Sequence, residues 1–112
     1  LGEPSLEEGD LKLFEIKADK QPIGRYVNRE DYVNHKISLN EGDLIYMFSD
    51  GYPDQFGGER GKKYKTKNFK RLLLSLATHG MDQQKKEVEA EFINWKGDLE
   101  QLDDVCVIGL RL

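Results

Sequence analysis

The chain has 112 residues, a length that fits one domain or part of one. Apolar residues make up 38% and charged residues 34%, and the apolar residues recur in periodic runs that argue against a disordered chain. The net charge of −4 disfavours a general nucleic-acid binder, and no stretch is apolar over the length that crosses a bilayer. We therefore expect no membrane contact by this segment. Because Cys106 is the single cysteine and cannot form an internal disulfide, we expect a reducing, cytoplasmic location.

The N-terminal part is predicted to contain a tail and two strands. Residues 1–10 are polar and include two glycines, so they are predicted to be a linker or tail, with the domain at 11–112. Strands are predicted over 11–18 and over 31–39, where apolar and polar residues alternate in the second case. Glu41-Gly42-Asp43 then predicts a hairpin turn to the next strand.

An uninterrupted apolar run, Leu44–Phe48, predicts a strand buried on both faces. It ends abruptly at Ser49-Asp50-Gly51. Residues 51–65 are rich in glycine and charge and are predicted to form a long loop, a kind of segment that often carries function.

Two helices and a strand complete the predicted order. Thr66 is the predicted cap of the first helix, which has an apolar stripe at helical spacing and is expected to stop at Gly80. Asp82 is the predicted cap of the second, which Gly97 ends, and residues 105–112 form a final apolar strand. The order indicates an α+β fold of mainly antiparallel strands, with two consecutive helices before the last strand.

Positive charge is concentrated between Glu59 and Arg71, where seven residues are basic and one is acidic. Such a run is typical of a solvated loop and helix start. The alternative is a docking patch for an acidic or phosphorylated partner.

Aspartates stand at the ends of the two most apolar strands. Asp50 follows Leu44–Phe48, and Asp103 and Asp104 precede the final strand. If these strands are antiparallel neighbours, the three carboxylates converge at one edge of the sheet. Clustered carboxylates repel one another unless a cation lies between them, and Mg²⁺ and Mn²⁺ prefer oxygen ligands. The pattern therefore favours hard-metal phosphoryl chemistry over a zinc site.

Each of these residues also has an ordinary structural reading. Asp-Gly after a strand commonly starts a turn, and Asp103-Asp104 can simply mark the entry to a strand. His35 and His79 are more typical of core or surface histidines, and Cys106 is expected to be a buried, inert thiol.

Three segments resemble SpoIIE-like protein serine/threonine phosphatases of the metal-dependent PPM type. GDLIYMFSDGYPDQFGG (Gly42–Gly58) is similar to the family's buried strand ending in Ser/Thr-Asp-Gly, and QLDDVCVIGLRL (Gln101–Leu112) resembles its terminal Asp-Asp strand. KADKQPIG (Lys17–Gly24) resembles a segment before the hairpin. The segments occur in the family's order, so this chain resembles the C-terminal portion of that domain. Cys106 stands where the family usually has Thr.

The resemblance implies a partial αββα sandwich with a binuclear Mn²⁺ or Mg²⁺ centre at one edge of its sheets. Its metal ligands map onto Asp50 and Asp103, while Asp54 matches a position that serves an additional metal in some relatives. The implied reaction is hydrolysis of phosphoserine or phosphothreonine on a signalling protein, without a phosphoenzyme. The expected parent is a bacterial signalling phosphatase, which can be the cytoplasmic part of a membrane-anchored sensor.

The resemblance also implies that this chain lacks part of the family's metal site. The family's N-terminal half carries an acidic strand whose Asp bridges both metals, and neither Asp10 nor Asp19 lies in such a motif. We therefore expect weak or absent metal binding and low activity for this chain alone, with partly uncovered strands that favour homodimers through exposed sheet edges. The alternative is a non-catalytic, phosphatase-like interaction domain that binds a protein partner.

Overall fold

The computed structural model describes residues 3–16 and 38–112. In chain order the elements are β1 (Leu6–Glu8), β2 (Leu11–Leu13), β3 (Leu44–Phe48), β4 (Phe56–Gly57), β5 (Lys62–Lys63), α1 (Thr66–Leu76), α2 (Met81–Lys96) and β6 (Val107–Arg111). All strand pairs are antiparallel, and both helices precede the last strand, so the predicted α+β class is confirmed. The strand predicted at 31–39 lies almost entirely outside the described residues, and residues 38–39 are not in a strand.

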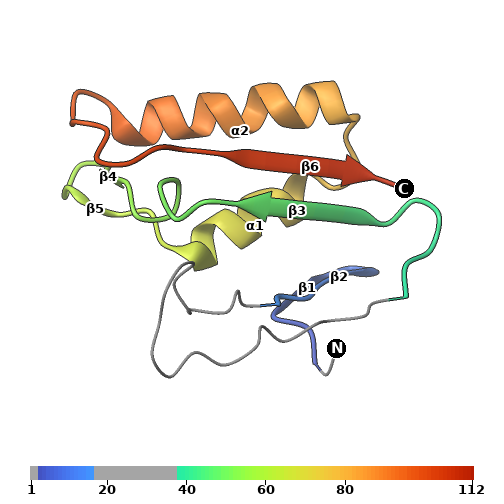
Figure 1. Ribbon diagram of the computed structural model, residues 1–112. Coiled ribbons are helices and arrows are strands. Elements are labelled where there is room, and N and C mark those ends of the chain that lie inside the picture. Colours follow the sequence, from blue (N-terminus) through green and yellow to red (C-terminus); the bar gives the residue numbers. More distant parts are fainter. Residues whose placement is uncertain (1–2, 17–37) are drawn as a thin grey trace, which may run out of the picture.

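The β3–β6 pair is the longest of the three two-stranded sheets in the described residues (Figure 1). Leu44 is paired with Arg111 and Phe48 with Val107, so the C-terminal end of β3 meets the N-terminal end of β6. At the other end the Leu112 amide donates to the Asp43 carbonyl at 2.9 Å. Strands far apart in sequence are thus aligned over their whole length.

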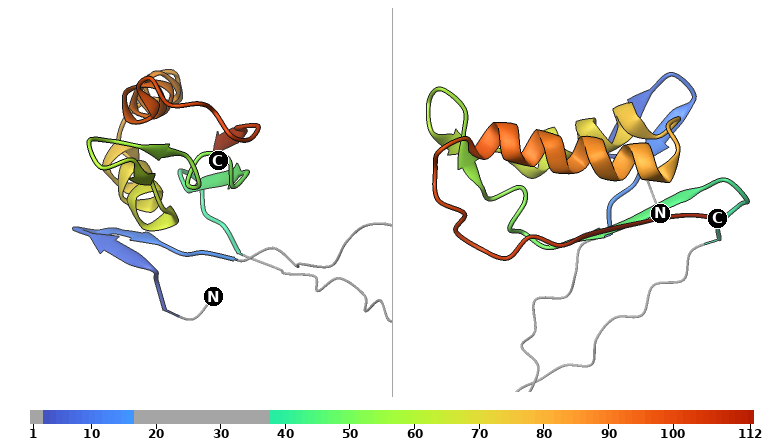
Figure 2. Two further views of the ribbon diagram at one scale, coloured as in Figure 1. Left: turned by 90° about the vertical axis from the view of Figure 1, so that its left-hand side faces the viewer. Right: turned by 90° about the horizontal axis from the view of Figure 1, so that it is seen from above.

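Helices α1 and α2 cover one face of this pair (Figures 1 and 2). Between the helices and the strands lies a hydrophobic core that is mainly aromatic. Its five buried members are Tyr52, Tyr64, Phe69, Leu73 and Phe92. The Tyr52 ring is tilted against that of Phe69, with centroids 4.5 Å apart, and against that of Phe92, 5.0 Å away. Burial of these side chains is the main stabilising contribution to the fold.

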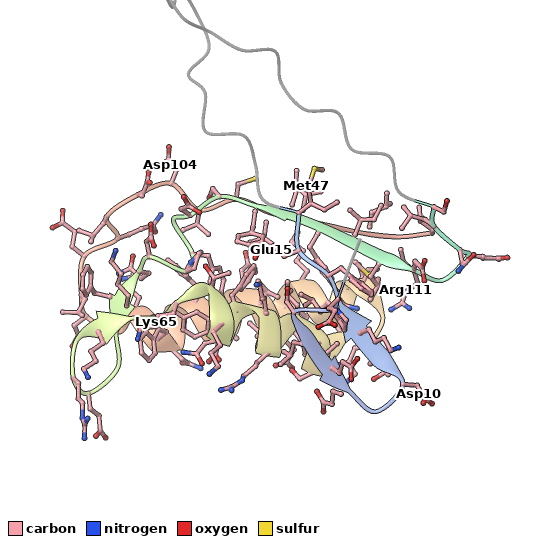
Figure 3. The ribbon with its side chains drawn as sticks, turned by 90° about the horizontal axis from the view of Figure 1, so that it is seen from below. Asp10, Glu15, Met47, Lys65, Asp104 and Arg111 are labelled. Carbon is pink, nitrogen blue, oxygen red and sulfur yellow. The ribbon has the colours of Figure 1, made fainter. Side chains whose placement is uncertain are left out.

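No described helix or strand packs on the opposite face of the β3–β6 pair. Met47 is 61% exposed, Ile108 52% and Leu110 53%. Figure 3 shows Met47 pointing away from the helices. The prediction that Leu44–Phe48 is buried on both faces is therefore wrong, because within the described residues only one layer packs on this strand. The other expectation, that β3 and β6 are partly uncovered, agrees with these exposed fractions.

The observed helix ends differ in part from the predicted ones. Thr66 is the first residue of α1 rather than its cap, and Lys65 is the cap residue. Gly80, in an extended conformation, is the N-cap of α2 and not the stop of α1, which ends at Leu76. Gly97, with φ of 53°, ends α2 as predicted because this left-handed region favours glycine.

The first hairpin differs from the predicted tail and strand. Residues 6–8, placed within the linker or tail at 1–10, form β1 and pair with β2. The strand predicted over 11–18 ends at Leu13 within the described part. The short hairpin contacts α1, which gives its leucines a surface to pack on. None of the helices in the described residues is long and apolar enough to span a membrane.

Candidate metal centre

Ser49 locks the end of β3 to the chain that enters β6. Its backbone amide donates to the Cys106 carbonyl at 2.9 Å. Its hydroxyl Oγ accepts from the Cys106 amide at 3.0 Å and donates to the Asp104 carbonyl at 3.0 Å. One small hydroxyl residue thus extends the β3–β6 ladder beyond its last regular pair.

Gly51 allows a close backbone approach at the same place. A Cβ atom built on Gly51 would lie 2.1 Å from the Asp104 carbonyl oxygen, far inside van der Waals contact. Only glycine fits here without a backbone shift. Asp50 lies between Ser49 and Gly51, so its backbone runs beside that of residues 104–106.

The predicted carboxylates are accessible at this edge. Asp50, Asp103 and Asp104 are exposed, and none forms an ion pair with another described residue. The Asp103 Oδ1 atom accepts from the Asp104 amide at 2.8 Å. These carboxylates stand at one end of the β3–β6 pair without a described cationic partner, which leaves them available as ligands for a hard cation.

Asp54 is connected to this edge through the backbone, while its carboxylate lies near a lysine. The Asp54 amide donates to the Asp50 carbonyl at 2.9 Å. Its Oδ1 atom lies 3.9 Å from Lys63 Nζ, and both side chains are more than half exposed. This weak surface pair neutralises part of the Asp54 charge.

The donor set fits part of a hard-metal site. Among the described residues, no cluster of three or more His, Cys, Asp or Glu side chains is close enough to hold a metal ion. The prediction that Asp50, Asp103 and Asp104 converge into one such cluster is therefore wrong, although the strands that carry them are antiparallel neighbours. Carboxylates are the ligands that Mg²⁺ and Mn²⁺ prefer, and these ions retain several waters. Two carboxylates at one edge can therefore contribute to such a site but do not complete a binuclear one.

The segment after Gly51 is packed rather than open, contrary to the long loop predicted for residues 51–65. Tyr52, Pro53 and Gln55 are almost fully buried. The Gln55 amide Nε2 donates to the Glu100 carbonyl at 2.8 Å, and the indole of Trp95 donates to the Gln55 carbonyl at 2.8 Å. Gln55 thereby ties the Ser-Asp-Gly turn to the chain that leads to Asp103. Sequence reasoning missed it, since a glutamine in a polar run carries no such signal.

The remaining candidates take ordinary roles. Cys106 is exposed, so the expectation of a buried thiol is wrong: the residue precedes β6 and is not covered by the helices. His79 is exposed at the α1–α2 turn. His35 lies outside the described residues.

The sequence matches the family described as Stage II sporulation protein E (SpoIIE) over residues 6–112. The chain belongs to the SpoIIE family. That match includes both aspartate-bearing strand ends, β3 and β6, as well as the two helices between them. The resemblance drawn from the sequence motifs is therefore confirmed.

A solved structure shows the same architecture. The SiaA-PP2C domain of Pseudomonas aeruginosa is similar with a TM-score of 0.69 and 28% identity over 74% of this chain. The similar region is 34% of that chain, so the SpoIIE chain spans about a third of its neighbour's length. A comparison with curated proteins gave no match. Family and neighbour together make this a phosphatase-type domain fragment.

Proposed function

We propose that this member of the SpoIIE family is the C-terminal part of a domain that hydrolyses phosphoserine or phosphothreonine on a signalling protein with Mn²⁺ or Mg²⁺. The observation that carries the proposal is the antiparallel pairing of β3 with β6, which brings Ser49-Asp50-Gly51 against the chain at residues 104–106. Membership of the SpoIIE family supports the choice of phosphoryl chemistry.

In this proposal Asp50 and Asp103 are the metal-binding residues. The hydrogen bond from the Asp104 amide restrains the Asp103 carboxylate and leaves its second oxygen for a ligand. A bound divalent cation would neutralise phosphoryl charge and make water more acidic. Ser49 and Gly51 act as positioning residues, because they hold the two backbones together. Asp54, turned to Lys63, would contribute only to an additional cation.

The chain alone is proposed to bind metal weakly and to have low activity. It spans about a third of its structural neighbour, and its described carboxylates form no cluster of three. The remaining ligands would come from the rest of the domain in a longer protein. A phosphorylated protein substrate, a reducing cytoplasmic location and a bacterial signalling role belong to the same proposal.

Removal of either carboxylate tests this assignment. In a longer chain that carries the whole domain, we expect Asp50→Asn and Asp103→Asn each to lower Mn²⁺-dependent kcat/KM on a phosphoserine peptide by about 100-fold or more, because each removes a charged metal ligand. Calorimetric titration should show the matching loss of Mn²⁺ affinity.

Asp10→Asn is the matched control, since Asp10 is exposed at the tip of the β1–β2 hairpin (Figure 3). It should leave both activity and Mn²⁺ affinity unchanged. Rates for Asp50→Asn equal to those of the unaltered chain would remove Asp50 from the metal site.

The second candidate is a non-catalytic phosphatase-like domain that binds a protein. It is favoured by the open apolar face of β3 and β6, where Met47, Ile108 and Leu110 are more than half exposed. Association of two copies through exposed sheet edges belongs to the first proposal, since the described β3–β6 sheet has only two strands. A whole domain that binds a partner but hydrolyses no phosphoester with Mn²⁺ would select the second candidate.

A further inference from the structure

We propose that the β5–α1 segment carries a basic surface that binds an acidic segment of a partner protein. The basic surface comprises Arg60, Lys62, Lys65, Lys67 and Arg71, all of them exposed. This interaction goes beyond the proposed hydrolysis and needs no metal ion.

The charge of this segment is opposite to that of the rest of the protein. Residues 59–71 carry seven basic and one acidic residue, a net charge of +6. Since the whole chain carries −4, the other residues together carry −10. Charges within about 8 Å of one another act together at physiological salt, so seven cations among thirteen successive residues produce a local positive field.

The described structure neutralises only two of the seven cations. Lys70 Nζ lies 2.8 Å from Glu15 Oε1, and both side chains are mostly buried. Lys63 lies 3.9 Å from Asp54. The members of the basic surface form no ion pair with another described residue. The undescribed segment 17–37 contains five basic and three acidic residues, so its composition is also net positive.

The positions of these cations cost stability instead of adding to it. The first turn of α1 contains no acidic residue, although the positive end of the helix dipole favours one. Lys67 and Arg71 are one helical turn apart, a spacing at which like charges repel. Lys65 has φ of 77°, in the region that favours glycine. An anionic partner would offset both the unfavourable interaction with the helix dipole and the repulsion between Lys67 and Arg71.

Backbone hydrogen bonds fix the basic surface to the packed segment that follows Gly51. The Lys65 amide donates to the Pro53 carbonyl at 2.7 Å, and the Tyr64 amide donates to the Gln55 carbonyl at 2.9 Å. Figure 3 shows Lys65 and Asp104 toward the same end of the molecule, opposite Arg111. The surface is therefore held on the packed segment that follows Asp50.

A short acidic protein segment fits this surface better than a nucleic acid. A polyanion that extends beyond residues 59–71 would meet a chain whose other residues carry −10. Phe56, an exposed aromatic side chain on β4 next to β5, already has the Lys63 ammonium 5.9 Å from its ring centroid. An acidic peptide requires neither a long track nor a stacking platform.

Fluorescence anisotropy with a labelled Glu/Ser peptide tests the proposal, in buffer with EDTA so that a failure of the metal site cannot affect the result. The unaltered chain should bind this peptide more tightly than a Gln/Ser peptide of equal length, and added salt should weaken binding. The triple variant Lys62→Glu, Lys67→Glu and Arg71→Glu should bind about tenfold more weakly or worse.

The control triple variant is Lys12→Glu, Lys85→Glu and Lys86→Glu, which changes the net charge equally at exposed positions on β2 and α2. It should retain the affinity of the unaltered chain, and circular dichroism should show both variants folded. Equal weakening by the two triple variants would overturn the proposal, because net charge alone would explain the binding. So would equal affinity for the Glu and Gln peptides, or tighter binding of a single-stranded oligonucleotide.

Discussion

At the scale of single residues, Gly51 decides whether the two aspartate-bearing strand ends can meet. Its missing side chain makes room for the Asp104 carbonyl, which a Cβ would approach to 2.1 Å. We expect Gly51→Ala to lower the free energy of unfolding by about 1–3 kcal/mol, because the backbone must shift and the Ser49 hydrogen bonds weaken. Urea denaturation measures this difference.

Gly80→Ala serves as the control for Gly51. Gly80 has φ of −61° and no atom within 4 Å of an added Cβ, so the cost should stay below about 1 kcal/mol. A Gly51→Ala protein as stable as the unaltered chain would mean that the strand ends do not approach as closely as described.

At the scale of elements, Gln84 joins α2 to the central strands. This buried side chain accepts a hydrogen bond from the Tyr46 hydroxyl on β3 and donates to the His79 carbonyl at 2.9 Å. Arg111 on β6 donates to the same carbonyl at 2.8 Å. A turn between helices is thus fastened to both strands through polar contacts.

We expect Gln84→Ala to destabilise the protein by about 1–3 kcal/mol in chemical denaturation, because the half-buried Tyr46 hydroxyl loses its acceptor. Gln83→Ala makes the same change in helix propensity one residue earlier. The Gln83 side chain bonds only to Glu87 on the exposed surface, at 2.7 Å, so its loss should cost little. Equal destabilisation by both variants would argue against the Tyr46–Gln84 contact.

At the scale of the whole molecule, the core depends on phenols that must stay protonated. Burial raises the pKa of Tyr52 well above its ordinary value, with the neighbouring Tyr64 and Glu91 adding to the effect. Burial also raises the pKa of Tyr64, whose hydroxyl donates to Glu91 at 3.0 Å. Tyr46 shows a smaller rise from burial, which Arg111 opposes.

These shifts make the fold sensitive to alkali. Above pH 10.0, the ordinary tyrosine pKa, the unfolded chain releases protons that the folded chain retains, so stability falls as pH rises and is fully present below that value. Tyr52→Phe should flatten this fall in urea denaturation series above pH 10.0. It should cost about 1 kcal/mol near neutral pH through the lost bond to the Val88 carbonyl. An unchanged pH slope would contradict the assignment.

Periodicity and motif order determined much of this protein from its sequence alone. Apolar runs located β3, α1, α2 and β6, because burial of one face or stripe imposes a repeat on the chain, and three ordered motifs indicated the SpoIIE family. Position at the ends of apolar strands indicated Asp50, Asp103 and Asp104, and the resemblance to the family selected Asp50 and Asp103 as the expected metal ligands.

Only the tertiary structure decided how those elements meet. Several features depend on partners about 40 to 70 positions away in the chain, which no local pattern encodes: the β3–β6 register, the close approach at Gly51, the burial of Gln55 and Gln84 and the exposure of Cys106. Gly80 was predicted as the stop of α1 but is the N-cap of α2, because glycine is common at both kinds of position. Local sequence sets which face is apolar; long-range packing sets what that face touches.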